Sequence, residues 1–135
     1  MIVADANILL YLMSPGPFHR QAEALRRKDP DWRVPQLWTL EISNALSRAV
    51  RDGEIGAVAS EEMMEDAHRL FSAGEVPVTG MDALRVANRY RLSAYDACYV
   101  ALAQFLGAPL ITEDKEVLVR AGTLACSLSQ ALGQH

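Results

Sequence analysis

Cysteine is scarce in this sequence of 135 residues, and long apolar runs are absent. The two cysteines, Cys98 and Cys126, do not form the CxxC pair that is typical of zinc and redox sites. Their small number favours a reducing cytoplasm. The longest uncharged apolar run in the second half, residues 97–103, is far shorter than the ~20 residues of a membrane span. The start of the sequence has no basic region, so we expect neither a signal peptide nor a membrane contact.

Positive charge is also limited, since 13 basic residues stand against 17 acidic ones and the net charge is −4. This balance excludes a protein that holds nucleic acid by phosphate contacts alone. Hydrophobic residues make up 50% and charged residues 22%, which excludes a disordered chain. A chain of this length can bury a sizeable core. We therefore expect residues 1–135 to form a single domain.

Short apolar segments alternate with helical patterns along the chain. Strands are predicted at residues 2–4, 75–78 (a weak one), 110–112 and 124–128, and a short strand or a loop is predicted at residues 32–35. Helices are predicted at residues 7–13, 18–28, 37–51, 61–73 with Ser60 as N-cap, 81–90, 94–106 and 115–121. Strands that alternate with helices favour a parallel sheet covered on both faces, which predicts an α/β fold.

Acidic residues directly follow two of the predicted strands. Asp5 comes after residues 2–4, and Glu113 with Asp114 comes after residues 110–112. Ligands of open α/β sheets bind beyond the carboxyl ends of the strands, where these acids are expected to lie. Because a helix follows each strand, Asp5 and Asp114 are also good N-caps. For either residue taken alone, capping is the favoured interpretation.

Two further acids stand in the first turns of predicted helices. Asp96 is followed by residues that are almost all apolar, which is typical of a buried helix. A buried carboxylate must be paired or bind a metal, although Ser93 three residues earlier also fits a capping box. Glu41 lies at the edge of the apolar stripe of its helix, three residues before Asn44. Taken alone, Glu41 is interpreted as an ordinary solvated residue.

Together these acids suggest a metal site. Carboxylates that converge at the rim of a sheet repel one another unless a cation neutralises them. Mg²⁺ and Mn²⁺ prefer such oxygen ligands, and they can activate water and stabilise the charge on a phosphodiester. The sequence leaves open whether the side chains converge.

Four blocks that cover nearly the whole length resemble the PIN-domain nucleases, and within them the VapC-type toxins of toxin–antitoxin pairs. The first block, residues 2–9, has the opening strand and first acid, and the second, residues 37–46, has Glu-x-x-Asn. The third block, residues 93–103, has Ser-Ala-Tyr-Asp-Ala and is the most specific. The fourth, residues 110–114, has Thr-x-Asp.

This resemblance implies a three-layer α/β/α fold with a central, mainly parallel sheet, and an endoribonuclease that depends on Mg²⁺ or Mn²⁺. Carried over by position, the catalytic and metal-binding residues are Asp5, Glu41, Asp96 and Asp114. Asn7, which stands where many members have Ser or Thr, and Thr112 then orient ligands or water, and Asn44 supports Glu41. Glu113 is an extra acid beside Asp114 that either shares the metal or faces solvent, and we favour solvent.

The resemblance also implies partners: an RNA substrate, a small VapB-like antitoxin and a second copy in a homodimer. Met63, Met64, Leu70 and Phe71 are candidates to contact an antitoxin helix, although residues at such spacing are more often core. The alternative is a protein with the same fold but no nuclease activity, a PIN-like module that binds RNA or a partner without cutting.

Other acidic α/β pockets fit the sequence less well. A receiver domain needs two acids after the first strand, and a haloacid-dehalogenase-like phosphatase needs Asp-x-Asp there. The segment Asp5-Ala6-Asn7 meets neither requirement. The motifs GxxxxGK, GxGxxG and HExxH are absent, which leaves nucleotide-binding and zinc-protease functions without support.

Overall fold

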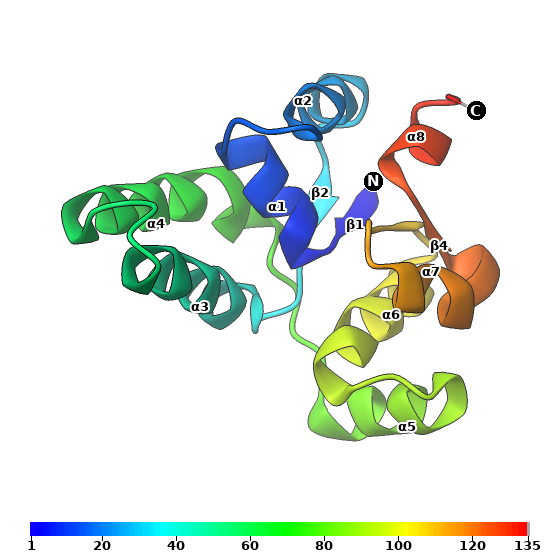
Figure 1. Ribbon diagram of the computed structural model, residues 1–135. Coiled ribbons are helices and arrows are strands. Elements are labelled where there is room, and N and C mark those ends of the chain that lie inside the picture. The colour runs from blue at the N-terminus through cyan, green and yellow to red at the C-terminus, as the bar shows by residue number, and fades with distance from the viewer. Residues whose placement is uncertain (135) are drawn as a thin grey trace.

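The computed structural model describes residues 1–134 and shows helices packed around a small central sheet (Figure 1). The elements follow in the order β1 (Ile2–Ala4), α1 (Ala6–Met13), α2 (His19–Lys28), β2 (Trp32–Arg33), α3 (Trp38–Arg51), α4 (Ala57–Phe71), α5 (Gly80–Tyr90), α6 (Ala94–Leu106), β3 (Leu110–Ile111), α7 (Lys115–Ala121), β4 (Ala125–Cys126) and α8 (Leu128–Ala131). Within residues 1–134, no helix combines the length and the apolar character needed to cross a membrane.

The four strands form one sheet in the order β2-β1-β3-β4, and every neighbouring pair is parallel. Val3 of β1 pairs with Arg33 of β2 on one side and with Leu110 of β3 on the other. The strands β1 and β3 therefore lie side by side at the centre. Because they run in the same direction, the residues that follow them leave the same edge of the sheet.

The sheet separates two apolar cores, since successive side chains of a strand point to opposite faces. Ile2, Ala4 and Ile111 face a core that helices α1 to α4 and α8 complete. Val3 and Leu110 face a second core, built mainly from α5, α6 and α7. This arrangement confirms the predicted three-layer α/β/α fold, with a sheet that is parallel throughout.

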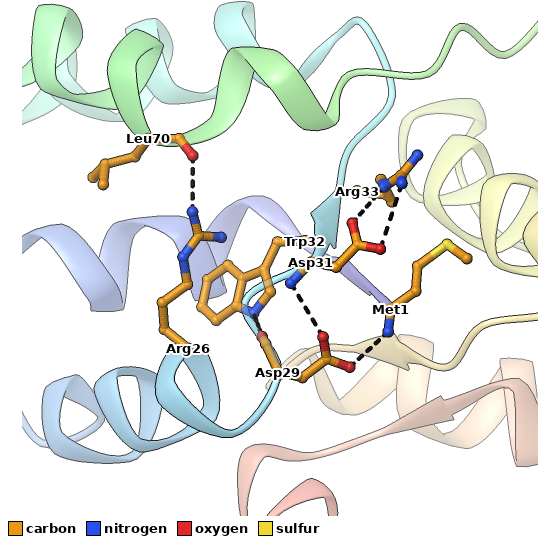
Figure 2. Close-up of polar contacts among 7 residues, drawn as sticks. All are labelled: Met1, Arg26, Asp29, Asp31, Trp32, Arg33 and Leu70. Carbon is orange, nitrogen blue, oxygen red and sulfur yellow. Dashed lines mark hydrogen bonds and ion pairs between the residues drawn. The ribbon is translucent and has the colours of Figure 1, made fainter.

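The segment before β2 is fastened to its neighbours by polar contacts (Figure 2). The guanidinium of Arg26 lies 5.0 Å from the centre of the Trp32 ring and donates to the carbonyl of Leu70 at 3.0 Å. The indole N–H of Trp32 donates to the carbonyl of Asp29, whose carboxylate pairs with the amino group of Met1 at 2.7 Å. These contacts join α2 to the end of α4 and to the start of β1.

The helix predicted at residues 61–73 has different bounds in the structure. Helix α4 begins at Ala57 with Gly56 as its N-cap, and it ends at Phe71. Ser60 is therefore not a cap, and its hydroxyl donates instead to the carbonyl of Ala57 at 2.6 Å. A serine inside a first turn can bond to the backbone of its own helix in this way.

The strand predicted at residues 75–78 is wrong, since only Glu75 in this segment forms a bridge, to Val34. The N–H of Val78 donates instead to the side-chain oxygen of Gln36 at 2.8 Å, and the Gln36 amide donates back to the Val78 carbonyl. Beyond the contacts with Val34, a side chain thus takes the place of a neighbouring strand at Val78.

The strand predicted at residues 124–128 is shorter in the structure, where β4 covers Ala125–Cys126. Ser127 and Gln130 form a complete capping box, and this local signal starts helix α8 at Leu128.

Candidate active site

Asp5 lies where the chain passes from β1 into α1, and its side chain is almost fully buried. One carboxylate oxygen accepts the N–H of Ala6 at 2.8 Å, so Asp5 caps α1 as predicted. The other accepts the hydroxyl of Thr112 at 2.7 Å. Burial raises the pKa of Asp5 from 3.8 to about 6, and both hydrogen bonds oppose this rise. The charges of Asp96 and Asp114 raise it further.

Thr112 directly follows β3 and is fully buried. Besides donating to Asp5, its hydroxyl oxygen accepts the N–H of Asp114 at 3.1 Å. The side-chain amide of Asn7 donates to the same oxygen at 3.4 Å. Pairing of Ala4 with Ile111 brings the ends of β1 and β3 together, and the Thr112 hydroxyl joins the residues that follow them.

Asp96 and Asp114 each belong to the start of a helix. Ser93 caps α6 by accepting the N–H of Asp96 at 3.1 Å. The Asp114 carboxylate caps α7 by accepting the N–H of Val117 at 3.1 Å, as predicted. Burial raises the pKa of Asp96, and the nearby charge of Asp114 raises it further. The two acids therefore lie at helix starts, and the charge of Asp114 still raises the pKa of Asp96.

Glu41 reaches this neighbourhood from α3. Its Oε1 accepts the hydroxyl of Tyr99 at 2.6 Å. Burial raises the pKa of Glu41 from 4.5 to about 7, and the bond from Tyr99 opposes the rise. The charges of Asp5 and Asp96 raise this pKa as well. The four acids predicted from the sequence thus come from four separate segments, and each is coupled by charge to at least one other.

Tyr99, which contacts Glu41, was not predicted from the sequence as a residue of the site. Asn44, which was expected to support Glu41, is exposed on α3, and Tyr99 is the residue that contacts the Glu41 carboxylate. A sequence signal existed, since a tyrosine in an otherwise apolar, buried helix carries a hydroxyl that needs a partner. The pattern does not reveal which residue that partner is.

Asn7 contributes a buried oxygen next to the acids. Its Nδ2 donates to Thr112, while its Oδ1 is buried and has no hydrogen-bond partner among the described residues. Buried polar atoms without a partner are uncommon in folded proteins. This amide oxygen is therefore available to a ligand that enters the site.

Glu113 faces solvent only in part, which differs from the solvent-facing position that the sequence favoured. Its side chain is half-buried, and its Oε1 accepts the N–H of Leu128 at 2.8 Å. The segment that starts α8 packs over the end of β3, and Glu113 satisfies the backbone there.

The oxygen atoms of these residues suit a divalent cation, although they do not form a complete coordination site. Within residues 1–134, no group of three or more His, Cys, Asp or Glu side chains stands close enough together to hold a metal ion. Like charges repel, and Asp5, Glu41 and Asp114 accept hydrogen bonds from protein groups instead. Carboxylate oxygens and the Asn7 Oδ1 are nevertheless the hard oxygen ligands that Mg²⁺ and Mn²⁺ prefer.

The apolar residues considered for a partner contact divide between core and surface. Phe71 is buried, and Met63 and Met64 pack against the same core. Leu70 is 41% exposed. A hollow between α1 and α4 is lined by Leu12, Met13, Met63, Asp66, Arg69 and Leu70.

Comparisons with known proteins match most of the chain. Residues 2–123 match the family described as PIN domain. The chain is 35% identical over 114 residues to VapC ribonuclease Mb0985 of Mycobacterium bovis, which covers 84% of this chain and 86% of that protein. It is 29% identical over 119 residues to Ribonuclease VapC3 of Pyrobaculum aerophilum, which covers 86% of this chain and 91% of that protein.

Solved structures share the fold. PAE2754 from Pyrobaculum aerophilum superposes with a TM-score of 0.77 at 23% identity, over 98% of this chain and 97% of that chain. A chain of a toxin–antitoxin complex from Klebsiella pneumoniae superposes with a TM-score of 0.68 at 19% identity, over 95% of this chain and 98% of that chain. At these identities the likeness concerns the fold.

Proposed function

The chain belongs to the PIN domain family, and from this premise we propose that it is a metal-dependent endoribonuclease of the VapC type. One observation carries the proposal beyond the family match. The pKa values of Asp5, Glu41 and Asp96 are each raised by the charge of at least one other acid of the set, which Asp114 completes, although the four come from four segments. A protein that only needed a stable fold would gain nothing from this costly grouping of like charges.

We assign the four acids to holding one or two divalent cations, Mg²⁺ or Mn²⁺. When bound, the cation supplies a water of lowered pKa and positive charge beside the phosphodiester. Thr112 joins the Asp5 carboxylate to the backbone N–H of Asp114, so the two acids are held at adjacent strand ends. Asp96 enters from the first turn of α6, where the helix dipole stabilises negative charge. The negative net charge does not oppose RNA binding, because the cation is the largest local charge.

We further propose partners for this activity. The substrate is RNA, and a small VapB-like antitoxin silences the enzyme in the cytoplasm. The hollow between α1 and α4, with Met63 and the exposed Leu70 in its lining, has the apolar character that suits an antitoxin helix. A homodimer stays a prediction.

The proposal is tested by incubating the purified chain with total cellular RNA in Mg²⁺, Mn²⁺ or EDTA. We expect discrete cleavage that requires metal and that falls at least about 100-fold in Asp5→Asn and Asp96→Asn. Asp52→Asn, at an exposed position after α3, is the matched control and should cut like the wild type. Circular dichroism of each variant checks that its fold is intact.

Thermal unfolding with added Mn²⁺ supplies a second readout that does not depend on finding the right RNA. A cation that binds only the folded chain raises its melting temperature. We expect this rise in the wild type and in Asp52→Asn, but not in Asp5→Asn. Normal cleavage by folded Asp5→Asn would overturn the assignment. Metal binding without cleavage of any RNA would favour a PIN-like binding module.

A further inference from the structure

The contact between Tyr99 and Glu41 joins two helices that are distant in the sequence. The two residues are 58 positions apart, and the hydroxyl oxygen lies 2.6 Å from Oε1. Among the described residues this is the one hydrogen bond that the Glu41 carboxylate accepts, which leaves its Oε2 without a protein donor. The orientation of the Glu41 carboxylate therefore depends on Tyr99.

Tyr99 also stands in a fixed relation to Asp96. The two residues are three positions apart on α6, so their side chains leave neighbouring points of the same helix face. The side chain of Tyr99 is 1% exposed and packs in the core of α5, α6 and α7, which holds the ring in place. A rigid ring thus carries its hydroxyl from the Asp96 face of α6 to Glu41 on α3.

Packing alone does not explain the hydroxyl. A phenylalanine would fill the same space without placing a polar oxygen in an apolar core, and such an oxygen is unfavourable unless it is bonded. The bond is made to a carboxylate, and bonds to charged groups are stronger than neutral ones. The hydroxyl is therefore explained by what it does to Glu41.

We propose that Tyr99 is a positioning residue of the candidate active site, whose hydroxyl holds Glu41 with its second oxygen directed to the other acids. The inference rests on the proposed function, because it concerns the acid that would hold a cation or position water. It assigns to Tyr99 the supporting role that the sequence suggested for Asn44.

The test replaces the hydroxyl alone. Tyr99→Phe keeps the ring, and Tyr95→Phe, at a 69% exposed position on the same helix, makes the same chemical change away from the contact. Titration calorimetry with Mn²⁺ measures the affinity of each full-length variant. We expect Tyr99→Phe to weaken Mn²⁺ binding by about 10- to 100-fold, which is typical for residues that orient metal ligands. Tyr95→Phe should bind Mn²⁺ like the wild type.

A double-mutant cycle separates positioning from general damage. If Tyr99 acts through Glu41, Tyr99→Phe weakens Mn²⁺ binding in the wild type but adds nothing in the Glu41→Gln background. An equal loss of affinity in both backgrounds would mean a structural role and would overturn the inference. Wild-type affinity in folded Tyr99→Phe would overturn it as well.

Glu41→Asp tests the same contact from the side of α3, in case Tyr99→Phe does not fold. The shorter side chain keeps the charge but withdraws the carboxylate from the Tyr99 hydroxyl. We expect weaker Mn²⁺ binding, and unchanged binding would contradict the inference. A wild-type chain that binds no Mn²⁺ and cuts no RNA would overturn the proposed function itself, which is distinguishable from failure of the Tyr99 variants alone.

Discussion

At Thr112 one buried hydroxyl serves three groups, since it donates to Asp5 and accepts from the N–H of Asp114 and the amide of Asn7. A hydroxyl has one proton and two lone pairs, so all of its capacity is used. Three of the candidate site residues therefore depend on a single side chain for their relative positions. Replacing Thr112 should therefore disturb the geometry of the site, although Thr112 carries no charge.

Replacing Thr112 with Val keeps the shape of the side chain but removes all three bonds. We expect the free energy of unfolding to fall by about 1–3 kcal/mol, because polar partners are left unsatisfied in the interior. We also expect metal-dependent RNA cleavage to be lost. Urea denaturation measures the first effect and gel analysis of RNA the second. Thr123→Val, at an exposed position, is the control and should change neither.

At the scale of elements, the sequence predicted the helix starts and ends that are set by capping residues. Asp5 and Asp114 stand between a strand and a helix, and each caps the helix that follows. Ser93 starts α6, and Gly107 ends it in the left-handed conformation. No strand forms at residues 75–78, where the Gln36 side chain bonds to the backbone of Val78, and β4 is shorter than predicted because the capping box of Ser127 starts α8.

Contacts between segments that are distant in the sequence could not be predicted from the sequence. The bond of Tyr99 to Glu41 and the bond of Glu113 to the N–H of Leu128 both depend on how the helices pack. The same limit applies to the grouping of the acids. Their identities followed from the sequence motifs, whereas the charge coupling among them required the fold.

Gly74 shows how closely the turn after α4 approaches β2. A Cβ at this position would collide with the backbone carbonyl of Trp32, which cannot move aside like a side chain. We expect Gly74→Ala to destabilise the protein by about 2 kcal/mol, in the range of overpacked sites. Thermal denaturation measures the loss. Gly80→Ala has open space around the new methyl group and should be close to neutral.

At the scale of the whole molecule, the grouped acids predict an unusual pH dependence. The pKa of Asp5 is about 6 in the fold against 3.8 for the free side chain, and that of Glu41 is about 7 against 4.5. Between about pH 4 and pH 7 the folded chain therefore holds protons that the unfolded chain has released. The stabilisation is complete below this window and is lost as the pH rises through it.

For the metal-free protein in EDTA we expect the melting temperature to fall between about pH 4 and pH 7. The shift of Asp5 alone corresponds to about 3 kcal/mol. The double variant Asp5→Asn with Glu41→Gln removes both groups and should flatten this dependence. Equal slopes for the wild type and the double variant would contradict the assignment of the effect to these acids.

The central position of β3 has a consequence during synthesis on the ribosome. The strand pairs with β1 from the start of the chain, yet it is translated only after α1 to α6. Until residues 110–114 emerge, Asp5 has no Thr112 hydroxyl to bond and no Asp114 beside it. A nascent or prematurely terminated chain thus carries three of the four acids without the strand that organises them. If the protein cuts RNA as proposed, we therefore expect the acidic site to form only after residues 110–114 have been translated.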